Sequence, residues 1–343
     1  DKIIYKFGLK EFLEAGYTKE INLISSTLGK KERILQALIF NWYRHKIALK
    51  NNIANFKPVI LFRSKTIEES ETDYEDFLNI VEKISIEDFN FFKTISDKIS
   101  QSKSIYEQGK SRTEQVIDFI KDNNIHYGEI VEFIKSNFAE KNLIITNSKD
   151  NKTQKEKTSE DQEKLLNSLE DKNNHIRAIF TVDRLTEGWD VLNLFDIVRL
   201  YQGQNAGGSD KKTPQATTKE KQLIGRGVRY FPFTYKDKIP NKRKFDEDLK
   251  NELRVLEELY YYTYDEDSKY ISHLKNELRK DGYVRDDKVV KIFKLKKEFV
   301  ESKFYKNTFL WYNTQIDNPN RKRTTLEDIK KDFFDLDHLT NPY

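Results

Sequence analysis

Short apolar segments that alternate with helix-forming stretches constrain the fold of this chain more than any other feature. The segments at residues 58–62, 142–146, 176–182 and 197–200 are apolar and rich in β-branched residues, as buried strands are. Long polar or amphipathic stretches separate most of them, which is the pattern of parallel strands joined by helical crossovers. The sequence therefore predicts an α/β fold with a parallel sheet flanked by helices.

A glutamine and two arginines share one face of a predicted helix beyond these strands. Gln222, Arg226 and Arg229 are spaced i, i+4 and i+7, so their side chains project from the same face. The run Thr217-Thr-Lys-Glu220 has the form of a capping box and predicts the start of this helix. Guanidinium groups and an amide on one face suit a planar or phosphate-bearing anion. The alternative is a solvated basic helix in a lysine-rich chain.

A turn that contains glycine follows the apolar segment at residues 176–182. It has the sequence Thr186-Glu-Gly-Trp-Asp190, in which Gly188 allows a backbone to approach a ligand closely. A strand, a glycine turn, a second strand and a helix with inward arginines follow one another at the edge of nucleotide-binding α/β sheets. The alternative is a structural turn that Asp190 caps.

Both runs resemble conserved motifs of superfamily-2 helicases. Thr186-x-Gly188-x-Asp190 is similar to motif V, and Gln222-x-x-Gly225-Arg226-x-x-Arg229 is similar to motif VI, both in the second RecA-like domain. Longer segments resemble the restriction (Res) subunit of type III restriction–modification enzymes; they lie at residues 9–20, 57–65, 188–193 and 256–261. The resemblance covers residues 1–280 and implies a RecA-like parallel sheet with an inserted helical element and a mainly helical C-terminal extension.

The resemblance also implies roles for single residues. Arg226 and Arg229 would reach the ATP phosphates across an interdomain cleft, and Gln222 would orient the attacking water or hold the same phosphate. Asp190 would contact a ribose hydroxyl or pair with an arginine. The expected nucleotide-side residues are Glu187, Gly188, Asp190 and Gly225. Surface salt bridges for the arginines and a packing role for Glu187 and Trp189 are the alternatives.

Polar residues at the carboxyl ends of the predicted strands are candidates for DNA contact. Small hydroxyls, amides and backbone N–H groups suit sequence-independent binding of phosphates. The candidates are Arg63, Ser64, Lys65, Thr146, Asn147 and Thr186. The alternative is that they are ordinary turn residues at strand ends.

The predicted organisation has three parts. Residues 1–50 form an interdomain segment that leads into the motor, with a helix that docks on the core. Residues 51–240 form the second RecA-like domain, with a helical insertion at 66–139. Residues 241–343 begin a C-terminal helical or spacer domain. A helix is expected at residues 245–263, with Tyr260-Tyr-Tyr262 more typical of core or interface than of a base-stacking platform.

The sequence lacks the parts of an ATPase that hold phosphate and magnesium. It contains no Gly-x-x-x-x-Gly-Lys-Ser/Thr loop, although nucleotide hydrolysis needs a phosphate cradle, a magnesium ligand and a charge-stabilising arginine. ATP and Mg²⁺ are therefore expected to be held mainly by a part of the protein outside this chain, and the chain alone is expected to be inactive. Its 5 histidines show no metal-ligand spacing, so no metal site is expected.

Composition limits the remaining possibilities. The net charge is only +4 for 343 residues, so any contact with DNA must use local patches. The absence of cysteine fits a reducing compartment, and no apolar run has membrane-spanning length, so a cytoplasmic protein is expected. The chain also contains no methionine.

The sequence thus predicts a fragment of the ATP-dependent DNA motor of a type III restriction endonuclease. The resemblance implies double-stranded DNA and a modification (Mod) methyltransferase subunit as partners, and no membrane. Another superfamily-2 helicase or a type I restriction motor subunit is the alternative of the same class. A RecA-like scaffold that binds nucleic acid without catalysis is the alternative of a different class.

Overall fold

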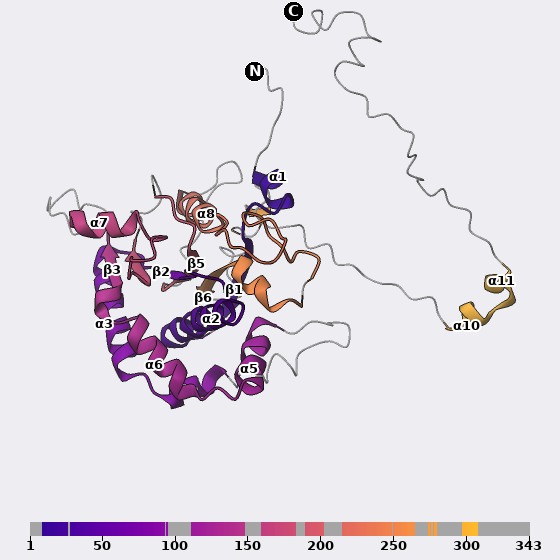
Figure 1. Cartoon of the computed structure of the whole chain (residues 1–343), viewed down its shortest axis with the longest axis horizontal. Helices are drawn as coiled ribbons and strands as arrows, with labels where there is room; N and C mark the ends of the chain where they lie inside the picture. The colour runs from indigo at the N-terminus through magenta and orange to yellow at the C-terminus, as the bar shows by residue number, and fades with distance from the viewer. Residues whose placement is uncertain are drawn as a thin grey trace, which may run out of the picture. The chain divides into compact units, whose positions relative to one another are not determined.

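A six-stranded parallel sheet with the order β1-β6-β5-β2-β4-β3 lies at the centre of the fold in the computed structural model (Figure 1). The strands are β1 (Glu20–Ser26), β2 (Val59–Arg63), β3 (Leu143–Thr146), β4 (Ala178–Thr181), β5 (Leu194–Arg199) and β6 (Glu258–Tyr264). Every pair of neighbouring strands is parallel. The six carboxyl ends therefore lie at one edge of the sheet.

The structure describes most of one compact unit and a small part of another. The described residues are 9–26, 28–92, 94, 111–147, 159–182, 189–201, 215–248, 250–264, 274, 276, 278–279 and 297–307. The first unit spans residues 1–287, and the second spans residues 288–343. In the second unit, the described helices are α10 (Lys297–Glu301) and α11 (Lys303–Lys306).

Helices cover both faces of the sheet (Figure 1). One face carries α2 (Lys30–Lys50), α3 (Ile67–Lys83), α5 (Arg112–Asp122) and α6 (Tyr127–Asn137), and the other carries α7 (Glu160–Leu166) and α8 (Gln215–Gly227). Side chains of β2 alternate between the faces, because successive residues of a strand point in opposite directions. Ile60 and Phe62 pack with α2 and α3, whereas Val59 and Leu61 pack with α7 and α8.

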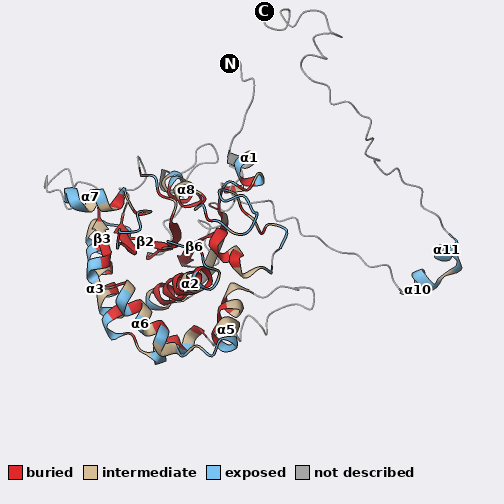
Figure 2. Cartoon of the chain, in the orientation of Figure 1, coloured by how far each residue is buried: buried red, intermediate tan, exposed pale blue. Residues whose placement is uncertain are grey.

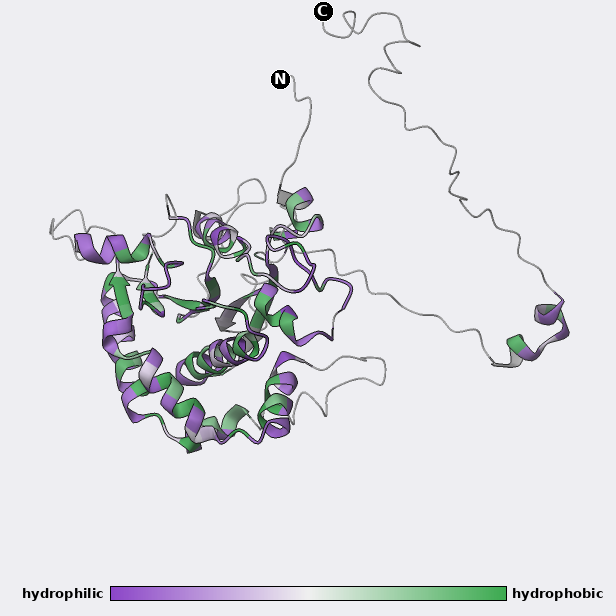
Figure 3. Cartoon of the chain, in the orientation of Figure 1, coloured by the Kyte–Doolittle hydropathy of each residue, from purple (hydrophilic) through white to green (hydrophobic). Residues whose placement is uncertain are grey.

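Shorter elements complete the first unit. They are α1 (Leu9–Glu14) and the 3₁₀ helices η1 (Ile86–Phe89), η2 (Glu140–Asn142) and η4 (Glu252–Glu257). Every residue of β2, β4 and β5 is buried. Figure 3 shows hydrophobic residues along the strands, whereas the outer helices carry both hydrophobic and hydrophilic residues. The predicted fold class, a parallel α/β sheet flanked by helices, is confirmed.

Helix α2 is buried on more than one side, because it lies between the sheet and the layer formed by α5 and α6 (Figure 2). Its apolar residues Ile34, Leu38 and Trp42 are fully buried, as the expected docking helix requires. Its polar residues Arg33 and Arg44 are buried as well. The sequence predicted the docking side of this helix but not the second layer that covers its other side.

The direction of the connections changes between the neighbouring strands β2 and β5. The chain leaves β2 through α3, α5 and α6 and reaches β3, whereas it leaves β5 through α8 and reaches β6 on the opposite side. Open α/β sheets bind ligands at the carboxyl ends of strands where the connections diverge in this way. Arg63 ends β2 and Arg199 ends β5, so the divergence point lies beside these two arginines.

One predicted element and one predicted helix start are wrong. The segment expected as a helix at residues 245–263 contains η4 followed by the strand β6. Helix α8 begins at Gln215, so Thr217 lies inside the helix and does not cap it. The helical stretch expected at residues 66–139 contains α3, η1, α5 and α6 in its described part. The domain boundaries at residues 50 and 240 stay predictions, and β1 and β6 from beyond them join the same sheet as β2–β5.

Candidate functional site

Helix α8 bears Gln222, Gly225 and Arg226 of motif VI and packs against the sheet through its apolar side. It ends at Gly227, so the prediction that Arg229 shares its face is wrong: Arg229 lies beyond the helix and forms an antiparallel β-bridge with Thr18. Leu223 and Ile224 are buried against β5 and β6, whereas Gln222 is exposed and Gly225 is half-buried. Gly227 allows this close packing, because a Cβ atom added to it would lie 2.9 Å from Cδ2 of Leu259 and would displace that side chain. The helix therefore lies close to β6, with Gln222 on its exposed side and Glu220 buried.

Arg226 and Arg229 contact the segment that resembles motif V. Nη1 of Arg226 donates a hydrogen bond to the carbonyl of Trp189, and Nη1 of Arg229 forms an ion pair with Oδ1 of Asp190. The side chain of Arg229 is 39% exposed and that of Asp190 is 70% exposed. Of the two roles expected for Asp190, the structure shows the arginine pair. The two motif segments therefore meet, although they are separate in the sequence.

Three of the predicted site residues lie outside the described residues. These are Thr186, Glu187 and Gly188. Trp189, for which packing was the alternative, is buried, and its indole Nε1 donates to the carbonyl of Leu166 at 2.9 Å. The described end of the motif V segment is therefore anchored to α7.

The segment before β1 holds the C-terminal end of α8. The buried ammonium group of Lys19 donates to the carbonyls of Leu192 and Leu194, both at 2.7 Å, and to that of Gly227 at 2.9 Å. Burial, and then the charge of Arg44, lower the pKa of Lys19. Lys19 and Leu194 stand at the amino ends of β1 and β5, so the two motif VI arginines also lie near the amino ends of strands. Nothing in the local sequence distinguishes Lys19 from other lysines.

A buried ion cluster occupies the carboxyl edge where the connections diverge. Nη1 of Arg63 lies 2.5 Å and Nε of Arg199 lies 3.6 Å from Oε1 of Glu220 on α8. The hydroxyl of Tyr261 donates to Oε2 of Glu220 at 2.5 Å, and that of Tyr201 donates to Oε1 at 3.3 Å. Burial alone would raise the pKa of Glu220, but the two guanidinium groups and the Tyr261 hydrogen bond hold it below its ordinary value.

The other candidates for DNA contact at this edge differ in their exposure. Lys65 is exposed. Ser64 is buried and its hydroxyl donates to Oδ2 of Asp73 at 2.5 Å. Thr146 and Asn147 are buried, and neither amide atom of the Asn147 side chain has a hydrogen-bond partner among the described residues. A buried amide without a partner is costly, so Asn147 is the member of this set that most needs a polar ligand.

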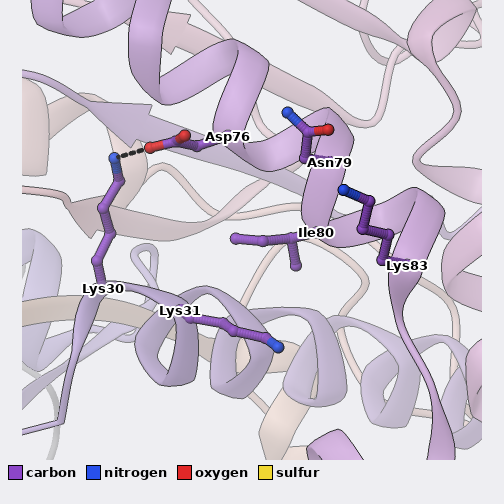
Figure 4. A pocket seen from close by; sticks show the side chains of 6 residues that line it. All are labelled: Lys30, Lys31, Asp76, Asn79, Ile80 and Lys83. Carbon is purple, nitrogen blue, oxygen red and sulfur yellow. Dashed lines mark hydrogen bonds and ion pairs between the residues drawn. The ribbon is translucent and has the colours of Figure 1, made fainter.

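Two cavities lie away from these residues. The first, of about 370 Å³, lies between α2 and α3 and is lined by Lys30, Lys31 and Lys83 among others; Figure 4 shows Lys30 paired with Asp76. Lys30 pairs with Asp73 and Asp76, and Lys31 pairs with Asp88. The second, of about 290 Å³, lies at the amino ends of β2 and β4 and is lined by His45, Lys57 and Arg177 among others. Within the described residues, the hydrogen bonds of Lys57 and Arg177 go to backbone carbonyls and to Asn41.

The described part of the chain offers neither a cluster of metal ligands nor a membrane-spanning helix. Within the ranges given above, no group of three or more His, Cys, Asp or Glu side chains is placed to hold a metal ion. In the same ranges, no helix is long and apolar enough to cross a membrane.

The fold and the meeting of the two motif segments define a parallel α/β protein in which two arginines at the C-terminal end of α8 and just beyond it contact the segment before β5. Residues 216–287 match the family model HI_1054_N, described as an N-terminal region. Over 213 residues the chain is 64% identical to the probable type III restriction-modification enzyme HindVIP Res subunit of Haemophilus influenzae, covering 62% of this chain and 41% of that protein. The predicted resemblance to type III Res subunits is therefore confirmed.

Two further similarities are weaker or less informative. An uncharacterized protein of Haemophilus influenzae is 58% identical over 118 residues, covering 34% of this chain and 26% of that protein. The fragment structure of a putative HsdR subunit of a type I restriction enzyme from Vibrio vulnificus YJ016 has a TM-score of 0.33 and 12% identity, covering 83% of this chain and 38% of that chain. This chain thus spans less than half the length of each of these relatives.

Proposed function

We propose that this chain is part of the ATP-dependent DNA motor of a type III restriction endonuclease. In this proposal, Arg226 and Arg229 act on the ATP phosphates, and the carboxyl edge of the sheet contacts the DNA backbone. The observation that carries the proposal is the contact between the two motif segments, in which Arg229 pairs with Asp190 and Arg226 bonds to Trp189. Res-subunit similarity over 213 residues supports it.

Arg226 and Arg229 together suit the binding of a phosphate. Its guanidinium groups carry donors in a planar fork that matches phosphate oxygens. The ion pair of Arg229 with Asp190 is partly exposed on both sides, and such solvent-screened pairs contribute only about 0–1 kcal/mol. Arg229 can therefore exchange its carboxylate partner for a phosphate at little cost. Bound there, it would stabilise the negative charge that develops on the transferred phosphoryl group.

Gln222 and Gly225 complete the proposed nucleotide side of α8. Gln222 is exposed, so its amide is free of the core and in reach of solvent. Glu187, Gly188 and Asp190 belong to the same proposal through the motif V resemblance. ATP and Mg²⁺ would be held mainly by a phosphate loop and magnesium ligands outside this chain, because this sequence contains no such loop.

The DNA backbone is proposed to lie along the carboxyl edge. Lys65 offers an exposed charge and Asn147 offers an amide that lacks a partner among the described residues. Arg63 contributes indirectly, because its guanidinium is paired with Glu220 and fixes the position of α8. Contacts of this kind carry no sequence information. Recognition of the DNA site is therefore assigned to a Mod subunit, in a cytoplasmic complex.

The test is ATP turnover by the parent enzyme in complex with its modification subunit and DNA. Arg229→Ala and Arg226→Ala should each lower the turnover number by about 10³–10⁵-fold, the effect of supplying such an arginine in well-studied nucleotide hydrolases. Lys238→Ala, a substitution at an exposed lysine outside the site, is the matched control and should leave turnover unchanged. Circular dichroism checks that each variant is folded.

The outcomes separate this proposal from its alternatives. Unchanged turnover in both arginine variants contradicts the phosphate role. If the parent protein binds DNA but never hydrolyses ATP, the alternative of a non-catalytic RecA-like scaffold is favoured. If ATP turnover depends on the arginines but the enzyme does not cleave DNA in a manner that depends on a modification subunit, another superfamily-2 motor is favoured.

A further inference from the structure

The cavity at the amino ends of β2 and β4 gathers basic side chains from three parts of the chain. His45 comes from α2, Lys57 from the segment before β2, and Arg177 from the segment before β4. The cavity has a volume of about 290 Å³. None of its lining residues belongs to the ATP or DNA sites proposed above.

Arg177 is a buried cation without a carboxylate partner among the described residues. It is 5% exposed, and Nη2 donates to Oδ1 of Asn41 at 3.1 Å. Its Nε is buried and has no hydrogen-bond acceptor in the part of the chain that the structure describes. The ring of Phe138 lies 5.9 Å from the guanidinium carbon. A buried charge is costly unless it is paired and hydrogen-bonded, so this guanidinium is poorly compensated by the protein itself.

Lys57 adds a second positive charge to the cavity, whereas His45 is a neutral polar group near pH 7. Nζ of Lys57 donates to the carbonyls of Asp171, at 3.1 Å, and Asn174. Nδ1 of His45 is buried without a partner in the described structure. Burial, and then the charge of Arg177, lower the pKa of Lys57 and bring that of His45 to about 4. The basic groups therefore act on one another.

The carboxylates of Asp171 and Glu170 offset part of this positive charge, since both act favourably on the Lys57 ammonium group. The lining also contains Lys172 and the carboxylate of Asp171. The Asp171 side chain already accepts a hydrogen bond from the backbone N–H of Asn173 at 2.8 Å. Glu170 accepts a hydrogen bond from the backbone N–H of Leu192 at 2.5 Å. The cluster thus keeps an excess of positive charge beside a cavity large enough for a small molecule.

We propose that this cavity binds a small oxyanion carried on an apolar body, either a phosphate monoester or a carboxylate. The oxyanion would accept hydrogen bonds from Arg177 and Lys57. The apolar body would pack on the apolar residues of the lining, which are Ala48, Leu49, Ile53 and Phe56. Charge-assisted hydrogen bonds to a guanidinium are among the stronger ones in proteins, and they would satisfy donors that the fold leaves without acceptors.

The experiment titrates the intact protein with phenyl phosphate, benzoate and inorganic phosphate by isothermal calorimetry, at constant ionic strength in chloride buffer. At least one of the three should bind saturably. Arg177→Met should weaken that binding by about tenfold or more, which corresponds to about 1.4 kcal/mol. Preference for phenyl phosphate identifies a phosphate ester, and preference for benzoate identifies a carboxylate.

Two further variants keep the test decisive. Lys57→Met should weaken binding in the same way, and it replaces Arg177→Met if that variant does not fold. Lys83→Met, which alters the other lysine-lined cavity, is the matched control and should leave binding unchanged. The proposal is overturned if none of the three anions binds saturably, or if both cavity variants bind them as tightly as the unaltered protein.

Discussion

At the scale of single residues, buried charges in this chain are held by partners from distant parts of the sequence. Glu220 of α8 joins the arginines that end β2 and β5, and Arg44 of α2 pairs with Asp196 of β5. The sequence indicated that Arg63 stands at a strand end, and this is correct. It could not indicate the pairing with Glu220, because the pairing depends on which strands become neighbours.

The Arg44–Asp196 pair gives a prediction of stability. Both side chains are fully buried, Nε of Arg44 donates to the carbonyl of Val255 at 3.1 Å, and the hydroxyl of Tyr262 donates to Oδ1 of Asp196 at 3.1 Å. Asp196→Ala should lower the free energy of unfolding by about 3–5 kcal/mol, because it leaves the guanidinium buried without its counter-charge. Urea denaturation followed by circular dichroism measures the change.

The double variant Arg44→Met/Asp196→Leu serves as the control for this explanation. Replacing both charges with apolar groups of similar volume is often close to neutral, so the double variant should recover most of the stability lost in Asp196→Ala. If the double variant is as unstable as the single one, packing rather than the uncompensated charge accounts for the loss.

At the scale of elements, the sequence predicted strands that are apolar and flanked by turn residues, such as β2 and β3. It failed for β6, whose Tyr260, Tyr261 and Tyr262 are fully buried. Interior strands of parallel sheets are buried on both faces, so they lack the alternation that marks other strands. The long charged stretch before β6 then favoured a helix. The core role predicted for these tyrosines is confirmed, although the predicted helix is wrong.

The position of α8 depends on Lys19, and this gives a second prediction of stability. Its ammonium group has three N–H donors, and they match three buried or partly buried carbonyls, including that of Gly227 at the end of α8. Lys19→Met should lower the free energy of unfolding by about 1–3 kcal/mol, because buried acceptors lose their donor. It should also lower the protection of amide hydrogens near the end of α8, measured by hydrogen exchange.

Lys164→Met is a suitable control for this prediction, since the ion pair of Lys164 with Asp161 is exposed on both sides. It should change stability by less than about 1 kcal/mol. If Lys19→Met leaves both the unfolding free energy and the exchange of α8 unchanged, the lysine does not fix the end of this helix.

At the scale of the whole molecule, the candidate functional residues fall into two groups on one sheet. The motif VI arginines lie by the amino ends of β1 and β5, where Lys19 holds α8. Lys65, Asn147 and the Glu220 cluster lie at the carboxyl edge. Helix α8 extends between the two groups, with Glu220 in one and Arg226 in the other. A shift of this helix would therefore affect both the proposed nucleotide contacts and the proposed DNA edge.

This arrangement gives a prediction for the isolated 343-residue chain. It carries arginines that would stabilise charge on a phosphoryl group, but its sequence has no phosphate loop to hold the nucleotide. Purified alone, it should therefore show no ATP turnover with or without DNA, while the parent enzyme shows turnover that DNA stimulates. A coupled phosphate-release assay measures both, with the Arg229→Ala chain as the background. Turnover by the isolated chain that DNA stimulates and Arg229→Ala abolishes would mean that it holds the triphosphate with its own residues.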